Sequence, residues 1–185
     1  MTRRVGIVGA GVISSTIHLP VLTAMRDVQV AWVADADDAR AAAIAAAFGV
    51  PHAPVASVAD RAAGCDAVLL AIPVGVRGPY LEMLARLGTG VLVEKPFARN
   101  VAEHERITSL FPAHKIACGF MRRAYASTAL VRQVLAEGWL GPARRIRIAE
   151  GGRTTKTGAD RSYFDDPKAG GGGILLELGC HALDL

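Results

Sequence analysis

The fold is decided by a stretch near the N-terminus, which reads Val5-Gly6-Ile7-Val8-Gly9-Ala10-Gly11-Val12-Ile13-Ser14. An apolar run rich in β-branched residues ends at two glycines spaced one residue apart, and a helix-compatible segment follows. Gly9 lets the chain turn sharply, and Gly11 has no Cβ to hold the backbone away from a bound phosphate. Free N–H groups at the start of the helix favour an anion such as a pyrophosphate. The stretch therefore predicts a dinucleotide-binding turn made by Gly9, Gly11, Val12 and Ile13.

The glycine pattern alone is weak, because it also fits a plain strand–turn–helix. Ser14 stands at its third position, where a small residue packs helix against strand. A second apolar run, 28–34, ends at Asp35, roughly 20 residues beyond the glycines. A carboxylate there accepts hydrogen bonds from a ribose diol and repels a 2′-phosphate, which predicts NAD, with NADP possible. The alternative is a surface aspartate that caps the next helix.

Composition indicates a folded globular protein, since 51% of the 185 residues are hydrophobic. No apolar run approaches the ~20 residues that cross a bilayer, so we expect no membrane partner. The net charge is +4, but the basic residues are scattered and only 5% of residues are aromatic, which argues against nucleic acid. Cys65, Cys118 and Cys180 form no CxxC pair and are expected as thiols, in a cytoplasmic protein.

Strand and helix patterns alternate over the first two thirds of the chain. Expected strands are 5–8, 28–34, 66–72, 91–93 and 116–119, and expected helices are 37–48, 57–62, 78–87 and 101–111. Such alternation predicts an α/β fold, a Rossmann-type doubly wound parallel sheet. Ligands bind at the carboxyl ends of its strands, where Gly9, Asp35, Ile72, Pro73 and Lys95 fall.

The pattern changes after residue 120. A helix is expected over 125–137, a strand with one solvated face over 143–149, a loop over 151–173, and a helix from Ile174. We therefore predict a dinucleotide-binding domain at 1–120 and, at 121–185, the truncated start of an α+β substrate domain.

Glu94-Lys95-Pro96 is the first constellation with chemical potential. It follows a buried strand, so the Lys95 ammonium is expected above the cofactor rim, where it can hydrogen-bond a substrate oxygen and relay a proton. The alternative is an ion pair between neighbours on the surface.

A second constellation lies near the C-terminus. If the chain is helical from Ile174, Glu177, His181 and Asp184 share one face. A carboxylate and an imidazole one turn apart suit general acid–base chemistry. Nothing marks a further ligand, so no metal is predicted. A solvated helix face is the alternative.

Together these motifs resemble the glucose–fructose oxidoreductase / inositol dehydrogenase (Gfo/Idh/MocA) family. The matching residues, in the family's order, are Gly9-Ala10-Gly11-Val12-Ile13 with His18 and Pro20, Asp35, Ala71-Ile72-Pro73, Glu94-Lys95-Pro96, Gly119-Phe120-Met121-Arg122-Arg123, and residues 171–184. The resemblance implies a nicotinamide-dependent oxidoreductase that acts on a polyol, a sugar or a related carbonyl compound. It also implies that the Lys95–Pro96 bond is often cis, and that histidine is the common residue where this chain has Arg77.

The resemblance further implies roles for individual residues. Lys95 would bind the reacting oxygen and assist proton transfer, His181 would be the general acid–base partner, and Glu177 would position an adjacent hydroxyl. Arg123 would join these three in binding the substrate. Glu94 would join Ile72, Pro73 and Lys95 at the cofactor.

Members of this family are much longer, with an open sheet that completes the substrate pocket and forms the oligomer interface. The chain is therefore expected to be a fragment or a truncated homologue, and a homo-oligomer only where that sheet is present. A non-catalytic dinucleotide-binding module, acting as a sensor or scaffold, is the alternative function.

Overall fold

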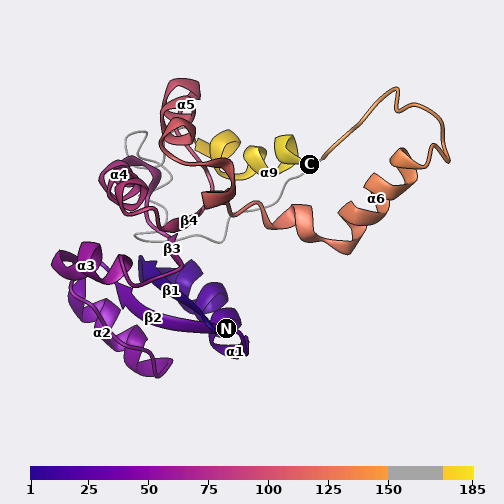
Figure 1. The fold of residues 1–185 in the computed structure, drawn as a ribbon. Helices are drawn as coiled ribbons and strands as arrows, with labels where there is room; N and C mark the ends of the chain where they lie inside the picture. The colour runs from indigo at the N-terminus through magenta and orange to yellow at the C-terminus, as the bar shows by residue number, and fades with distance from the viewer. Residues whose placement is uncertain (150–172) are drawn as a thin grey trace. The chain divides into compact units, whose positions relative to one another are not determined.

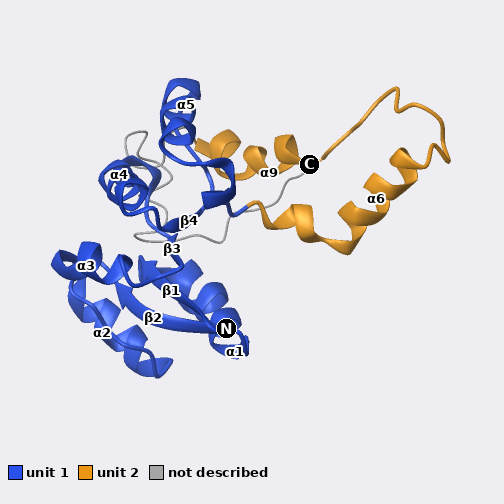
Figure 2. Ribbon diagram, viewed as in Figure 1, with its two compact units in different colours: residues 1–119 blue, residues 120–185 orange. Residues whose placement is uncertain are grey.

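The computed structural model describes residues 1–149 and 173–185. These residues form two compact units, 1–119 and 120–185, which Figure 2 colours blue and orange.

The first unit is built on a parallel sheet (Figure 1). Its strands, in the order β2-β1-β3-β4-β5, are β2 (Val28–Ala34), β1 (Arg3–Val8), β3 (Ala67–Leu70), β4 (Gly90–Val93) and β5 (Ile116–Cys118). All neighbouring pairs are parallel. The Rossmann-type sheet predicted from the alternation is thereby confirmed, because parallel neighbours need crossover connections of the kind that helices supply.

His52 extends the sheet beyond β2. It makes an isolated parallel bridge to Val33, where the Val33 N–H donates to the Pro51 carbonyl and the Ala53 N–H donates to the Val33 carbonyl, both at 2.9 Å. Within the sheet β1 lies between β2 and β3, so the chain leaves β1 first on the β2 side and then on the β3 side. That order is the doubly wound one, with its switch point between the carboxyl ends of β1 and β3.

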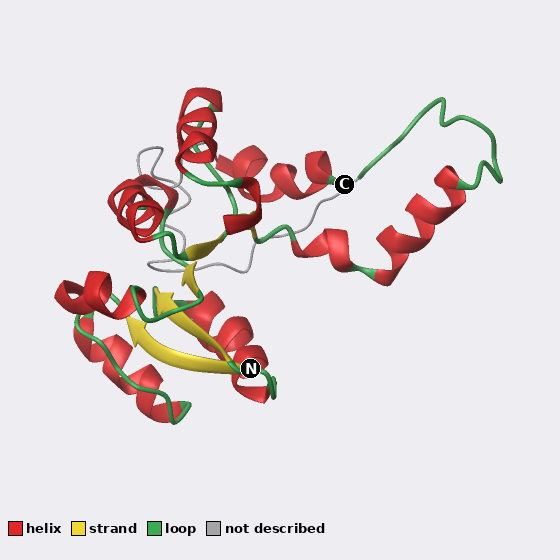
Figure 3. Cartoon of the chain, in the orientation of Figure 1, coloured by secondary structure: helices red, strands yellow, loops and turns green. Residues whose placement is uncertain are grey.

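Helices cover both faces of the sheet (Figure 3). One apolar layer joins the strands to α1 (Leu19–Ala24) and α2 (Asp38–Ala47). The other joins them to α3 (Val58–Ala62), α4 (Gly78–Leu87) and α5 (Val101–Leu110). Ile7 and Leu69 belong to the first layer, and Val8 and Leu70 to the second. Successive strand residues thus point to opposite faces, as the pleat requires, and in β1 and β3 both faces are buried, whereas Leu92 of β4 is 37% exposed.

Side-chain caps begin α2 and α5, but not α3. Asn100 caps α5, with its side-chain oxygen accepting the Glu103 N–H at 2.9 Å. Asp37 caps α2 in the same way, accepting the Arg40 N–H at 3.0 Å. Ser57 stands at the start of α3 but makes no cap hydrogen bond, because its hydroxyl donates backwards to the Pro54 carbonyl.

Trp32 explains a glycine inside β1. The indole is 2% exposed and lies so close to Gly6 that a Cβ there would be 2.1 Å from Cζ2 of the ring. The register between β1 and β2 shifts at this point, which brings Trp32 opposite Gly6. A side chain at position 6 would therefore force the indole out of the core.

The described part of the second unit is helical. It contains η5 (Met121–Ala124), α6 (Ala126–Ala136), the π-helical turn η6 (Leu175–Gly179) and α9 (Cys180–Asp184). The predicted strand over 143–149 is wrong: these residues are exposed and lie in no helix or strand. Their alternation of polar and apolar residues satisfies one face of a strand, but a strand also needs a hydrogen-bonding neighbour. The predicted loop over 151–173 lies outside the described residues except at Gly173.

Across residues 1–149 and 173–185, no helix has the length and apolar character needed to cross a membrane. Cys65, Cys118 and Cys180 are thiols of intermediate burial, as expected from their spacing.

Candidate functional site

The glycine turn lies at the end of β1. Gly9 has a φ of +107°, and a Cβ there would lie 2.3 Å from the carbonyl oxygen of Ala71, just beyond β3. The Gly9 N–H donates to the Ala34 carbonyl at the end of β2 at 2.8 Å. Only glycine fits this left-handed, closely packed position. At Gly11, by contrast, a Cβ would meet no heavy atom within 4 Å, so the backbone is open there to a bound group.

A buried serine lies in the first turn of the helical segment that follows the glycine turn. Ser14 is fully buried, and its hydroxyl donates to the Gly9 carbonyl at 2.5 Å. This bond satisfies the hydroxyl inside the helix–strand contact, so serine is accommodated at the third fingerprint position. Val12 and Ile13 precede it and are 61% and 39% exposed. The π-helical turn η1 (Ser14–His18) then leads into α1.

The Asp35 carboxylate hydrogen-bonds to the backbone of the glycine turn. Its Oδ2 accepts the Ala10 N–H at 2.6 Å, and its Oδ1 accepts the Asp37 N–H at 2.9 Å and Nη2 of Arg40 at 2.6 Å. The residue is 7% exposed. Burial raises the pKa of this carboxyl, but the Asp37 and Ala10 N–H groups and Arg40 outweigh burial and leave the pKa below its ordinary value. Asp35 is therefore a charged, buried anchor of the dinucleotide turn.

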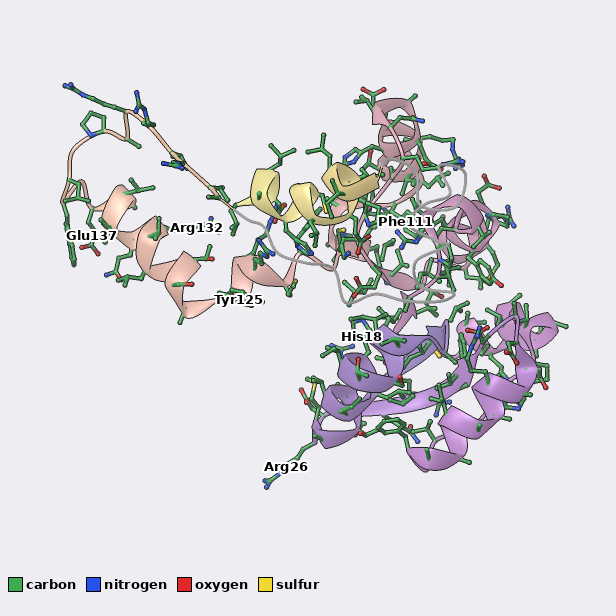
Figure 4. The ribbon with its side chains drawn as sticks, turned by 180° about the vertical axis from the view of Figure 1, so that it is seen from behind. His18, Arg26, Phe111, Tyr125, Arg132 and Glu137 are labelled. Carbon is green, nitrogen blue, oxygen red and sulfur yellow. The ribbon has the colours of Figure 1, made fainter. Side chains whose placement is uncertain are left out.

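Glu94 and His18 link the turn helix to the Glu94-Lys95-Pro96 segment. His18, labelled in Figure 4, places Nε2 2.7 Å from Oε1 of Glu94, and both side chains are less than a fifth exposed. Oε2 of Glu94 accepts the Lys95 N–H at 3.1 Å. Burial raises the pKa of the Glu94 carboxyl. The hydrogen bonds to His18 and to the Lys95 N–H lower it by more, so the pKa of Glu94 lies below its ordinary value. The carboxylate also lies against Gly119, where a Cβ would be 3.2 Å from Oε1.

Arg77 contacts the same segment, a role that no local sequence pattern indicates. It is 3% exposed. Its Nε donates to the Ile72 carbonyl at 2.8 Å, and its Nη1 donates to the Glu94 and Pro96 carbonyls, both at 2.5 Å. The Lys95–Pro96 bond is cis, as the family resemblance implied.

The first unit thus brings most of the predicted cofactor residues to one edge of the sheet. Gly9 follows β1, Ile72 and Pro73 follow β3, and Glu94 and Lys95 follow β4. A Cβ on Gly9 would lie 3.0 Å from Cγ2 of Ile72. These strands are neighbours, so their carboxyl ends share the rim where a doubly wound sheet binds ligands.

The second unit holds its own polar cluster. Arg123 grips Asp184 with two hydrogen bonds, Nε to Oδ2 at 2.7 Å and Nη2 to Oδ1 at 2.5 Å. The Arg123 guanidinium also lies 5.8 Å from the Phe120 ring centroid, and that ring meets His181 edge-on at 6.1 Å. His181 is 3% exposed. The paired charges tie η5 to α9 and fix the surroundings of the imidazole.

Several predictions of role are not tested by these contacts. Glu177 lies in η6 and His181 in α9, whereas Lys95 belongs to the first unit. The pairing of Lys95 with His181 therefore stays a prediction, as does substrate binding by Arg123. Among the described residues, no group of three or more His, Cys, Asp or Glu side chains is placed to hold a metal ion.

This sheet order, with a glycine turn backed by an acidic anchor, defines a dinucleotide-binding protein of the Rossmann class. Residues 3–120 match the model of the Gfo/Idh/MocA oxidoreductase family, described as having an NAD-binding Rossmann fold. The chain belongs to this family, as its motifs led us to expect.

Named relatives support the same placement. The chain is 32% identical over 182 residues to dTDP-3,4-didehydro-2,6-dideoxy-alpha-D-glucose 3-reductase of Streptomyces antibioticus, covering 97% of this chain and 54% of the relative. It is 31% identical over 188 residues to inositol 2-dehydrogenase of Rhizobium meliloti (strain 1021), covering 100% and 54%.

A solved structure shares the fold. KijD10, a 3-ketoreductase of Actinomadura kijaniata solved with NADP and TDP-benzene, superposes with a TM-score of 0.77 at 24% identity, covering 97% of this chain and 55% of that one. The chain therefore spans about half the length of the curated relatives it matches.

Proposed function

We propose that this chain carries the cofactor site and the proton-transfer lysine of an NAD(H)-dependent oxidoreductase acting on a hydroxyl or carbonyl carbon of a sugar, cyclitol or related polyol. The single observation that carries the proposal is the position of Lys95. It follows β4, beside the end of β3, which packs against Gly9 of the dinucleotide turn. The named relatives are a sugar reductase and an inositol dehydrogenase, which supports the substrate class.

Each residue then has a distinct task. The nicotinamide cofactor, when bound, supplies or accepts the hydride. The Lys95 ammonium hydrogen-bonds the substrate oxygen and moves its proton. His181 serves as the general acid–base partner, while Glu177 and Arg123 orient the neighbouring hydroxyls. Gly9, Gly11, Val12 and Ile13 hold the pyrophosphate on their backbone.

The cofactor preference rests on Asp35. Its charge is stabilised by two backbone N–H groups, so it remains an anion at neutral pH and repels a 2′-phosphate. We infer a preference for NAD(H) over NADP(H). The three thiols suit a reducing compartment, which supports a cytoplasmic location.

Lys95→Ala tests the catalytic assignment. We expect the variant to lose turnover while its affinity for NADH stays close to that of the unsubstituted chain, because Lys95 acts on the substrate oxygen. Lys115→Ala, in the turn before β5, is the matched control and is expected to retain both properties. Full turnover by Lys95→Ala would remove the lysine from the mechanism.

The second candidate is a dinucleotide-binding module without catalysis, which is supported by the match of residues 3–120 to a family model with an NAD-binding Rossmann fold. Titration with NADH followed by a screen of polyols, sugars and nucleotide sugars separates the two. Tight NADH binding without oxidation or reduction of any compound supports the module, and measurable turnover rejects it.

A further inference from the structure

Arg77 is a buried cation that the proposed chemistry does not use. Arg77 is 3% exposed, so its guanidinium is shielded from water. Burying a charged group costs free energy unless hydrogen bonds replace the lost hydration. Three backbone carbonyls do so, those of Ile72, Glu94 and Pro96. They belong to the two segments that leave β3 and β4 at the cofactor edge of the sheet.

Two of these hydrogen bonds flank Lys95 in the chain. The Glu94 and Pro96 carbonyls come from the residues on either side of it, and both accept from the same nitrogen, Nη1, at 2.5 Å. The chain must therefore fold around the guanidinium between these two residues. Nε holds the Ile72 carbonyl at 2.8 Å, which ties the folded segment to the end of β3.

We propose that Arg77 is the positioning residue for Lys95, a guanidinium clamp that fixes the Glu94-Lys95-Pro96 segment against the end of β3. The inference rests on the proposed function for the meaning of Lys95, but the clamp itself is a property of the first unit. Arginine suits this task because its planar fork places several donors in fixed directions and keeps its charge at every physiological pH. A lysine has the charge on one point and lacks the fork.

A merely structural role for Arg77 must be distinguished from positioning. Arg77 also precedes α4, where its carbonyl accepts the Leu81 N–H at 3.0 Å, so substitution can disturb that helix. The measurement therefore has to report on the Lys95 amine. The chain contains four lysines, and Lys115 in the same unit provides an internal reference.

The experiment compares the full chain with Arg77→Lys by trace labelling with acetic anhydride, resolved by mass spectrometry, with and without NADH. We expect the Lys95:Lys115 labelling ratio without cofactor to change about fivefold in Arg77→Lys, and the protection of Lys95 by NADH to fall by a similar factor. Arg106→Lys is the matched control, since Arg106 pairs with Glu82 on the surface, and it is expected to match the unsubstituted chain.

The outcomes are separable. A folded Arg77→Lys whose cofactor-free ratio stays within about twofold of the unsubstituted chain overturns the clamp. If NADH fails to protect Lys95 in the unsubstituted chain, the proposed function loses its placement of Lys95, while the cofactor-free ratio still decides the role of Arg77. If turnover is measurable, Arg77→Lys should lower kcat and leave the KM for NADH nearly unchanged.

Two further measurements guard against a variant that does not fold. Arg77→Gln is a neutral alternative, and its amide is too short to reach both segments, so it should show the same change in ratio. In the unsubstituted chain, the Arg77 Nε–H should exchange with solvent far more slowly than that of Arg106. Equal exchange rates would overturn the clamp without any substitution.

Discussion

Replacing Asp35 with asparagine should destabilise the first unit more than any conservative surface change. The carboxylate accepts three donors: the Ala10 N–H, the Asp37 N–H and Nη2 of Arg40. An asparagine amide has one oxygen and one NH2 group. In either orientation, the NH2 group therefore faces a backbone N–H that it cannot satisfy.

The magnitude follows from these contacts. A buried hydrogen bond to a charged acceptor contributes about 1.5–3 kcal/mol. The pair with Arg40, whose side chain is 48% exposed, adds about 0.2–1 kcal/mol. We therefore expect Asp35→Asn to lower the free energy of unfolding by about 2–4 kcal/mol. NADH binding should weaken as well, because the Ala10 N–H that orders the glycine turn loses its acceptor.

The contribution of Asp35 to the free energy of unfolding depends on pH. The folded-state pKa of Asp35 lies below its ordinary value of 3.8, so its contribution is complete above that value and is lost as pH falls through the folded-state pKa. Urea unfolding followed by far-ultraviolet circular dichroism should therefore show a large difference in unfolding free energy between the unsubstituted chain and Asp35→Asn at neutral pH. This difference in unfolding free energy should become smaller as the solution becomes strongly acid.

Asp37→Asn is the matched control for this prediction. Asp37 caps α2 through the Arg40 N–H, its side chain is 52% exposed, and asparagine caps a helix about as well as aspartate. Its free energy of unfolding should change by less than about 0.5 kcal/mol. Equal stabilities for Asp35→Asn and Asp37→Asn at neutral pH would refute the view that Asp35 anchors the turn.

Substitutions in and beside the glycine turn make further predictions. Gly9→Ala forces a side chain into a left-handed backbone, 2.3 Å from the Ala71 carbonyl, and should cost about 2 kcal/mol or more of unfolding free energy. Gly11→Ala meets open space, so its unfolding midpoint should stay unchanged while titration shows weaker NADH binding; equal NADH affinity would contradict a phosphate site there. Arg40→Ala removes the cation beside Asp35 and should raise the preference for NADH over NADPH about fivefold, measured as a ratio of dissociation constants. An unchanged ratio would contradict a role for Arg40 in cofactor choice.

The sequence predicted the parts of the fold that depend on local pattern. The apolar runs 28–34, 66–72 and 91–93 predicted strands, and β2, β3 and β4 lie there, although Leu92 of β4 is 37% exposed. The position of Lys95 at the cofactor edge followed from counting strands. Each of these inferences uses residues close together in the chain.

The contacts that shape the site are distant in sequence. His18 and Glu94 are 76 residues apart, and Arg77 reaches carbonyls 5, 17 and 19 residues away. A lone arginine beside a helix carries no sign that its partners are carbonyls from the segments that follow two strands. The failed strand at 143–149 has the same origin, since a polar–apolar alternation says nothing about whether a neighbouring strand exists.

The two tryptophans lie in different units and in opposite surroundings. Trp32 is 2% exposed against Gly6, whereas Trp139 is 63% exposed. Intrinsic fluorescence of the chain should consequently resolve into a blue-shifted component shielded from iodide and a red-shifted component that iodide quenches. Loss of the shielded component would signal melting of the nucleotide-binding sheet, which gives the first unit a built-in optical reporter.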